Sequence, residues 1–430
     1  MECLAKPEVH QDRMSPFNNS SQTTVIMTGA RMHYAVPRLL YEAGLLKRFY
    51  TDAYIGNKPV LEWLLRHVPG MSRMPAIARW LGRKDPIIPG QLVSSFDSFT
   101  FRQTWLRRGQ EGNIARILQL HADGNKAFNE WVIGQGIEGC SAIYGLNRDS
   151  LEVFGEAKKH GITCILEQCS VPRLIEVQLL AEEIEKWPDW DADLIPPPQN
   201  DPLIRREEEE WQLADRVIAP SESVIKSLAM CGFESDETRL VPYGIDTSAF
   251  ALEPKTNLEP NRKLRILYVG RVSIMKGIQY LLEAFRMLDT DALEARLVGS
   301  IHLEEAKTKC YERWATFMGH IPRREMKDVL AWADIAIMPS LSEGSSIFVL
   351  EAIASGVPVI ATESSGTVIR DGIDGFVVAD RSSEALATAI HEILDNRQIL
   401  KGFQERLSES RALISLEAYQ ERLTKEILDS

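Results

Sequence analysis

Two glutamates stand eight residues apart in an otherwise apolar stretch, SEGSSIFVLEAIASGVPVIAT, at residues 342–362. The first, Glu343, precedes a cluster of small residues, and the second, Glu351, falls inside the apolar run. The small residues are Gly344, Ser345 and Ser346. They predict a loop that opens onto a helix closed by Gly356, and the first backbone N–H groups of a helix have no partner within it. Because these donors and the helix dipole attract anions, the stretch predicts an anion site flanked by two carboxylates.

Two cations follow a second apolar stretch, ILYVGRVSIMKG, at residues 266–277. The pattern predicts a strand that ends at Gly270, with Arg271 and Lys276 just beyond it. Arginine offers a bidentate fork and lysine a compact point charge, and both suit a diphosphate. Taken alone, these are equally well surface cations at a strand end. Their place in the same expected cleft as the anion site favours a diphosphate ligand.

The spacing of the two glutamates suits a nucleoside diphosphate sugar. At 1.5 Å per residue, Glu351 lies about 7 Å along the helix from its first turn. A phosphate at the helix start would leave Glu343 on one side of the ligand and Glu351 on the other. Sugar, diphosphate and ribose follow one another in such a molecule. The alternative for isolated glutamates is structural, with Glu351 paired to a neighbouring lysine and Glu343 solvated.

Two regions of the chain alternate short apolar runs with amphipathic segments, which is typical of βαβ units in a parallel sheet. The strands expected in the first region are residues 23–30, 141–145, 162–168 and 216–220. Those expected in the second are residues 264–270, 294–300, 315–320, 334–340 and 357–362. A polar, proline-punctuated segment at 241–263 separates the regions, and Ser221 is expected to cap the helix after residue 220. The pattern predicts two doubly wound α/β domains whose strand ends face each other across a ligand-binding cleft.

The motif strand–Gly–Arg–x4–Lys–Gly, followed by the E-x7-E pair, closely resembles the retaining GT-B glycosyltransferases of family 4, also called glycosyl transferases group 1. The resemblance covers roughly residues 262–400. It implies the GT-B fold, with two Rossmann-like domains facing across a cleft. The expected parts are a disordered leader (1–22), an acceptor-binding domain (23–245), a nucleotide-sugar-binding domain (262–409) and a C-terminal helix (410–430) that packs on the first domain.

The resemblance also implies roles for individual residues. Arg271 and Lys276 would stabilise the departing diphosphate. Glu351 would bind the ribose, and Glu343 would contact the donor sugar near its reacting carbon. The further binding positions are Gly29 and Gly270 at strand ends, His320 and Ile321 beside the nucleobase, and Gly344, Ser345 and Ser346 at the helix start. No metal and no cofactor is expected, because the two cations would take over the neutralisation of the leaving group.

The first domain departs from the family pattern, beginning with the loop after the first strand, which has the single glycine Gly29 where the family often has two. The family often carries a histidine near the donor sugar, where this chain has Glu167, Gln168 and Cys169. The interdomain segment VPYGID has Tyr243 where the family usually has asparagine. The absence of that histidine puts the contacts on the sugar side in question and leaves the diphosphate site intact.

Composition and charge narrow the class of partner. The net charge of −12 argues against general nucleic-acid binding, and six cysteines at no metal-ligand spacing indicate reduced thiols in a cytoplasmic protein. Residues 61–108 hold eight Lys/Arg against three Asp/Glu and several aromatic residues. This segment suits contact with the inner face of an anionic membrane or with a phosphorylated acceptor, and a solvated helical face is the simpler interpretation.

The resemblance, together with the two cations, therefore implies a metal-independent, retaining hexosyltransferase. It would move a sugar from a nucleotide donor to a hydroxyl group of a saccharide, a lipid-linked or a small-molecule acceptor. Two alternatives stay open: a nucleotide-sugar epimerase of the same architecture, and a non-catalytic GT-B partner protein.

Overall fold

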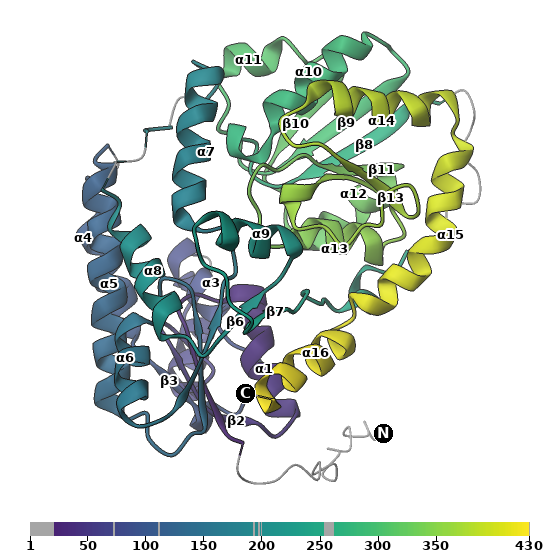
Figure 1. The fold of residues 1–430 in the computed structure, drawn as a ribbon. Helices are drawn as coiled ribbons and strands as arrows, with labels where there is room; N and C mark the ends of the chain where they lie inside the picture. Colours follow the sequence, from purple (N-terminus) through teal and green to yellow (C-terminus); the bar gives the residue numbers. More distant parts are fainter. Residues whose placement is uncertain are drawn as a thin grey trace, which may run out of the picture.

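The computed structural model describes residues 21–71, 74–110, 112–191, 194–196, 198, 200–252 and 262–429. The expected leader, residues 1–22, lies outside the described residues except for its last two positions, and so does part of the linker. Figure 1 shows two α/β bodies, one above the other, each built on its own sheet. The two doubly wound domains expected from the sequence are confirmed.

The first sheet has seven parallel strands in the order β3-β2-β1-β4-β5-β6-β7. Its strands are β1 (Thr23–Met27), β2 (Leu46–Thr51), β3 (Val93–Ser95), β4 (Ala142–Leu146), β5 (Thr163–Glu167), β6 (Arg216–Ala219) and β7 (Thr238–Leu240). Its helices are α1 (Ala35–Glu42), α2 (Pro59–His67), α3 (Pro75–Leu81), α4 (Asp97–Arg107), α5 (Ile114–Gln135), α6 (Leu151–Lys159), α7 (Arg173–Lys186), α8 (Pro202–Leu213) and α9 (Glu222–Met230).

The second sheet has six parallel strands in the order β10-β9-β8-β11-β12-β13. Its strands are β8 (Leu264–Val269), β9 (Leu293–Val298), β10 (Ala315–Gly319), β11 (Ile335–Met338), β12 (Val359–Thr362) and β13 (Gly375–Val378). The remaining helices are α10 (Ile278–Leu288), α11 (Glu305–Lys309), α12 (Met326–Trp332), α13 (Ile347–Ala354), α14 (Ser383–Asp395), α15 (Gln398–Leu413) and α16 (Leu416–Leu428). Short 3₁₀ turns are η1 (Arg31–Tyr34), η3 (Gly90–Leu92), η4 (Thr247–Phe250), η5 (Ile274–Lys276), η6 (Arg323–Glu325) and η7 (Glu363–Ser365).

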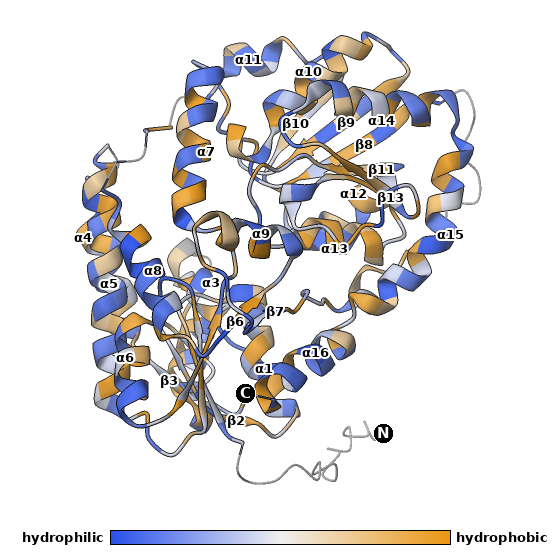
Figure 2. Ribbon diagram, viewed as in Figure 1, coloured by the Kyte–Doolittle hydropathy of each residue, from blue (hydrophilic) through white to orange (hydrophobic). Residues whose placement is uncertain are grey.

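Every strand expected from the sequence is present, and four strands were not expected. Three of these, β3, β7 and β13, are edge strands of three or four residues, which are too short for an alternating pattern to stand out. The fourth, β2, has Lys47 and Arg48 near its start, which interrupt the apolar run. Figure 2 shows hydrophobic residues along the strands and hydrophilic residues along outer helices such as α5 and α15. Within the described residues, no helix has the length and apolar content needed to cross a bilayer.

The C-terminal segment joins the two domains. Figure 1 shows α15 running down beside the second domain and α16 lying against α1 of the first. Gln420 of α16 donates to the Leu39 carbonyl (2.8 Å), and Arg422 donates to the Pro242 carbonyl (2.9 Å). A Cβ on Gly244 would lie 2.3 Å from the Ser415 carbonyl oxygen, so the interdomain segment passes directly under the α15–α16 junction.

A second connection is made by α7, which belongs to the first domain and reaches the second. The Glu183 carboxylate at its end is fully buried. It accepts hydrogen bonds from Gln279 (2.8 Å) and Tyr280 (3.0 Å) of α10 and pairs with Arg381 (2.7 Å). Because a buried carboxylate without partners is costly, these three donors hold the domains in one relative position.

We expect Gly244→Ala to lower the free energy of unfolding by about 1–3 kcal/mol, because its Cβ would overlap backbone that cannot move away easily. Gly402→Ala is the matched control, since Gly402 lies inside α15 with open space around its Cβ position. That control should keep or slightly raise the stability. Denaturant unfolding of both variants checks this, and equal stability of Gly244→Ala and the parent chain would contradict the close approach.

Candidate active site between the two domains

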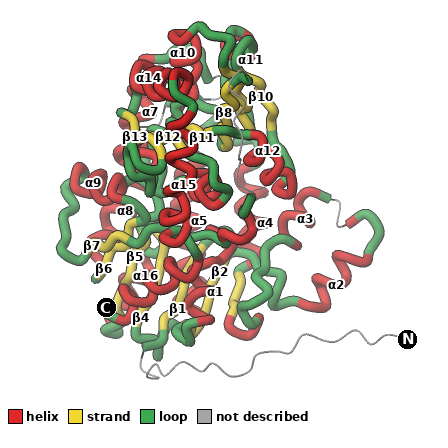
Figure 3. Tube along the Cα trace, turned by 90° about the vertical axis from the view of Figure 1, so that its right-hand side faces the viewer, coloured by secondary structure: helices red, strands yellow, loops and turns green. Residues whose placement is uncertain are grey.

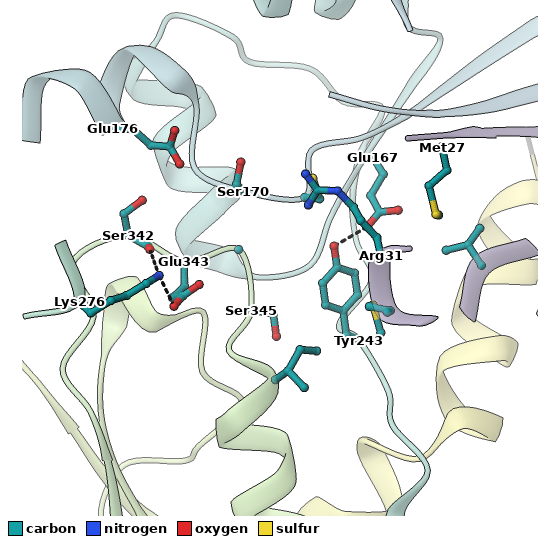
Figure 4. Close-up of a pocket in the computed structure, with 15 residues that line it drawn as sticks. Met27, Arg31, Glu167, Ser170, Glu176, Tyr243, Lys276, Ser342, Glu343 and Ser345 are labelled. Atoms are coloured by element: carbon teal, nitrogen blue, oxygen red, sulfur yellow. Dashed lines mark hydrogen bonds and ion pairs between the residues drawn. The ribbon is translucent and has the colours of Figure 1, made fainter. Parts of the chain in front are cut away.

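A cavity of about 330 Å³ lies where the carboxyl ends of the two sheets face each other. Its first-domain wall includes Arg31, Glu167 and Tyr243, and its second-domain wall includes Lys276 and Glu343. Figure 4 shows the two walls, with Lys276 and Glu343 on one side and Arg31, Glu167 and Tyr243 on the other. The cleft expected from the sequence is therefore a built pocket with charged groups on both faces.

Lys276 and Glu343 form a direct ion pair on the second-domain wall. The Lys276 ammonium lies 2.5 Å from the Glu343 carboxylate and 3.4 Å from the Ser342 carbonyl oxygen. Each side chain is about a quarter exposed, 24% for Lys276 and 23% for Glu343. The sequence assigned these residues to the diphosphate and to the sugar, and the structure brings their charged ends into contact.

The position of Lys276 is set by the glycine that follows it. Gly277 has φ +68°, and a Cβ there would lie 1.9 Å from the Pro339 carbonyl oxygen. Only glycine tolerates both the left-handed backbone and this approach. The η5 turn therefore sits directly on the chain that leaves β11, which is the chain that carries Glu343.

The start of α13 has free donors, as expected. Ser346 is the N-cap residue, and among the described residues no side chain caps this helix. The Ser345 hydroxyl is buried, has no hydrogen-bond partner in the described part of the chain and lines the cavity. The helix ends after eight residues, with Gly356 in the left-handed conformation just beyond it. A buried hydroxyl beside unpaired N–H groups is a ready site for an anion.

Glu351 lies within α13 and is buried, with 3% of its side chain exposed. Its partner is Arg323 of η6, 2.6 Å away, where the sequence allowed for a lysine. Burial raises the pKa of Glu351, and the Arg323 guanidinium partly offsets that rise. The same guanidinium lies 5.1 Å from the Phe250 ring centre. Glu351 is not among the residues that line the cavity.

The remaining expected site residues, Arg271, His320, Ile321, Gly29 and Gly270, are not among the residues that line the cavity. Arg271 is exposed, and within the described residues its side chain has no hydrogen bond or ion pair. His320 is exposed and Ile321 is half-buried, just after β10. Gly29 donates its backbone N–H to Asp52 (2.9 Å). The Gly270 carbonyl oxygen lies 1.8 Å from where a Cβ on Gly299 would be, so two strand ends touch there through their backbones.

Glu167 is a buried carboxylate in the segment where the family often has a histidine and this chain has none. It accepts a hydrogen bond from Tyr144 (2.6 Å) and another from Tyr243. Burial raises the pKa of both tyrosines well above the ordinary value, so both remain protonated donors. Tyr243, which departs from the family's asparagine, therefore orients this carboxylate. The neighbouring Cys169 thiol has its pKa raised to about 11 by burial and stays protonated.

A strained turn presents Arg31 to the cavity. Met32, His33 and Tyr34 have φ of 45°, 52° and 62°, a left-handed run that non-glycine residues rarely adopt. Such strain persists where the surroundings enforce it, and it is common at functional sites. Arg31 and Met32 line the cavity, whereas His33 is exposed and is not among the lining residues. Sequence reasoning missed Arg31, although its place four residues after β1 was a usable signal.

The comparisons with known proteins agree with this geometry. Residues 263–396 match the family of glycosyl transferases group 1. The putative teichuronic acid biosynthesis glycosyltransferase TuaC of Bacillus subtilis is 33% identical over 169 residues, which span 37% of this chain and 42% of that protein. The D-inositol 3-phosphate glycosyltransferase of Geodermatophilus obscurus is 30% identical over 215 residues, which span 44% of this chain and 47% of that protein. The chain thus spans less than half the length of both relatives.

Solved structures match over nearly the whole chain. HepE of Anabaena, in complex with UDP and glucose, superposes with a TM-score of 0.58 at 13% identity, covering 95% of this chain and 100% of that chain. Sucrose-phosphate synthase of Thermosynechococcus elongatus superposes with a TM-score of 0.60 at 20% identity, covering 94% of this chain and 98% of that chain. The expected GT-B fold is confirmed. The sequence matches support a group 1 glycosyltransferase, and they do so chiefly through the second domain.

We expect Tyr243→Phe and Tyr144→Phe each to lower the free energy of unfolding by about 1.5–3 kcal/mol, because each removes a hydrogen bond to a buried carboxylate. The loss of unfolding free energy in the double variant should differ from the sum of the two single losses, because both hydroxyls bind Glu167. Tyr41→Phe, at an exposed tyrosine, is the matched control and should change stability by less than about 0.5 kcal/mol. Denaturant unfolding reports all four, and strict additivity would argue against a shared carboxylate.

Proposed function

We propose that this chain is a retaining glycosyltransferase that moves a hexosyl group from a nucleotide-diphosphate sugar to a hydroxyl acceptor without a metal ion. The observation that carries the proposal is the Lys276–Glu343 pair beside the uncapped start of α13, on the wall of a cavity that the first domain closes. This wall lies in the segment that matches glycosyl transferases group 1. The nucleotide-sugar donor is further supported by the likeness to HepE, whose structure holds UDP and glucose.

The donor diphosphate would bind at the start of α13, against the unpartnered Ser345 hydroxyl. Lys276 would exchange part of its pairing with Glu343 for the phosphate oxygens, and Arg271 would turn its free guanidinium toward them. Once Lys276 is engaged by phosphate, the Glu343 carboxylate is free to accept from hydroxyl groups of the sugar. Two cations aimed at the leaving diphosphate supply the stabilisation that matters in the transition state.

The nucleoside would extend from the diphosphate toward Glu351 and the segment after β10. Glu351 already holds Arg323, so the ribose hydroxyls would share or displace that guanidinium. His320 and Ile321 would border the base, largely through their backbone. This arrangement places the ribose outside the enclosed part of the cavity, in agreement with a lining that excludes Glu351.

The chemistry requires no dedicated base on the protein. The bond from the anomeric carbon to the phosphate oxygen breaks, and the acceptor oxygen bonds to that carbon from the same face. Configuration is retained because the new bond forms on the face that the phosphate leaves, and the acceptor proton passes to the leaving phosphate. The acceptor would approach along the first-domain wall, where Arg31 and Glu167 offer a cation and a carboxylate for its hydroxyl or acidic groups.

Two other functions fit the sequence less well. An epimerase of this architecture needs acid and base side chains on both sides of the sugar and releases no nucleotide in net turnover. A non-catalytic partner would keep the fold without the charged site, whereas Lys276 and Glu343 are present and in contact. Release of nucleoside diphosphate that depends on an added acceptor distinguishes the transferase from both.

We expect Lys276→Ala and Arg271→Ala to lower kcat by about 10²–10³-fold, because each removes a charge from the leaving diphosphate. The matched control is Arg265→Ala. Arg265 lies at the start of β8, the strand that Arg271 follows, and its guanidinium pairs with Glu294 at 3.0 Å, away from the cavity. Turnover should survive that change. Nucleotide release measured with a fixed donor and acceptor separates these cases, and near-normal kcat in Arg271→Ala would sink the assigned role.

Chelation should leave turnover unchanged, since Arg271 and Lys276 replace a metal at the leaving group. The transferred sugar should keep its anomeric configuration, which proton NMR of the product reads directly. Activity lost in chelator and restored by Mg²⁺ or Mn²⁺ would refute metal independence. An inverted product would refute retention while leaving glycosyl transfer in place.

A further inference from the structure

Helix α2 carries an apolar face that the rest of the chain does not cover. Val60, Trp63, Leu64 and Val68 are 73%, 58%, 44% and 40% exposed. The spacing of Val60, Trp63 and Leu64 places them along one side of α2, and Val68 follows directly where the helix ends. We call these four residues the α2 face. Single exposed apolar residues are ordinary, and a continuous stripe at helical spacing is not.

The side of α2 next to these residues explains why the helix forms. Leu65 packs with Ile55 and Leu81 in a small core that is separate from the cores under the two sheets, and Leu61 packs against its edge. The helix is therefore folded by one side while its second apolar side stays in water. Figure 3 shows α2 and α3 as a pair that projects from the first domain.

The charge around the α2 face is opposite in sign to that of the whole chain. Residues 58–84 hold six Lys/Arg and one Asp/Glu, in a protein with a net charge of −12. The one acidic residue, Glu62, is shared by Arg66 (2.8 Å) and Lys84 (2.5 Å), so it cannot neutralise both. Arg79 is exposed on α3. Trp63 stacks on His67, with ring centres 4.7 Å apart.

We propose that the α2 face docks this protein on an anionic lipid bilayer, with Trp63 and its apolar neighbours at the headgroup boundary and the basic side chains on the lipid phosphates. Apolar and aromatic residues on one side of a helix, with cations beside them, are the features of a helix that lies in a bilayer surface. Positive charge on a negative protein selects an anionic surface over a neutral one. Met74, just before α3, and Trp105, on α4, are further exposed apolar residues of the first domain.

The docking element is joined to the loop before Arg31 through one ion pair and one hydrogen bond. Arg83, just after α3, pairs with Asp52 (2.7 Å), and Asp52 also accepts the Gly29 N–H (2.9 Å). Gly29 belongs to the loop that leads into Arg31 at the cavity wall. Docking would therefore set the acceptor side of the cleft against the bilayer, which favours a lipid-linked acceptor. Only this last consequence rests on the proposed function, and vesicle binding does not require transferase activity.

The test uses the full chain and two kinds of vesicle, phosphatidylcholine alone and phosphatidylcholine with about 30 mol% phosphatidylglycerol. In co-sedimentation, the parent chain should bind the anionic vesicles and not the neutral ones. Trp63→Ser combined with Leu64→Ser should weaken binding by roughly tenfold or more. The matched control combines Met230→Ser and Leu413→Ser, two apolar residues that are 74% and 59% exposed elsewhere, and it should bind like the parent.

A second measurement guards against a variant that misfolds. Lipids brominated along their acyl chains should quench tryptophan fluorescence in the parent chain, and Trp63→Phe should remove most of that quenching while anionic vesicles still bind. Binding should weaken as salt rises, because exposed charges are screened. Equal binding by the α2-face variant, or no binding of the folded parent to anionic vesicles, would overturn the proposal. A dimer in sedimentation equilibrium that the α2-face variant abolishes, without vesicle binding, would assign the face to a second copy of the chain and overturn it too.

Discussion

The site depends on one close contact between the backbones of the two domains. A Cβ on Gly344 would lie 2.0 Å from the Cys169 carbonyl oxygen, so the loop before α13 touches the chain after β5 with no side chain between them. The Ser221 hydroxyl donates to the Gly344 carbonyl oxygen across the same boundary, at 2.6 Å. Ser221 is the N-cap residue of α9 but does not cap it with its side chain, because its hydroxyl serves the interdomain contact instead. Together with the contacts of Glu183, this approach keeps Lys276 and Glu343 opposite the Arg31 wall.

The two walls of the cavity were not equally predictable, because their residues are brought together in different ways. Lys276, Glu343 and Ser345 belong to strand–loop–helix units, in which the order of residues fixes which strand end they follow. Their place at the cleft was therefore readable from spacing alone. Glu167 and Tyr243 are 76 residues apart and meet through their side chains. No local pattern encodes that pairing. The sequence therefore showed Glu167 in the segment where the family often has a histidine, but it could not show that Tyr243 binds this carboxylate.

The fold was predictable for a related reason. Buried parallel strands are short, continuous apolar runs, and the sequence shows nine of them where the structure has strands. The strands that were not predicted are the short edge strands β3, β7 and β13 and the inner strand β2. The edge strands are too short to show an apolar pattern, and in β2 the charged residues Lys47 and Arg48 interrupt the apolar run. The left-handed run at 32–34 was also beyond prediction, because three consecutive non-glycine residues rarely adopt that backbone. It is imposed by the packing of Tyr34, which is buried among Phe49 and Tyr54.

The central claim is that the second-domain wall binds a nucleotide diphosphate sugar through its own side chains. Isothermal titration of the full chain with UDP, GDP, ADP and their common sugar conjugates, in the presence of chelator, tests it most directly. We expect one site per chain, a clear preference for one nucleotide, and affinity that survives chelation. Saturating ligand, at about 100 times its dissociation constant, should also stabilise the fold by roughly 2.7 kcal/mol. Failure of every nucleotide and every conjugate to bind would contradict the account and leave the chain as a GT-B protein without a donor.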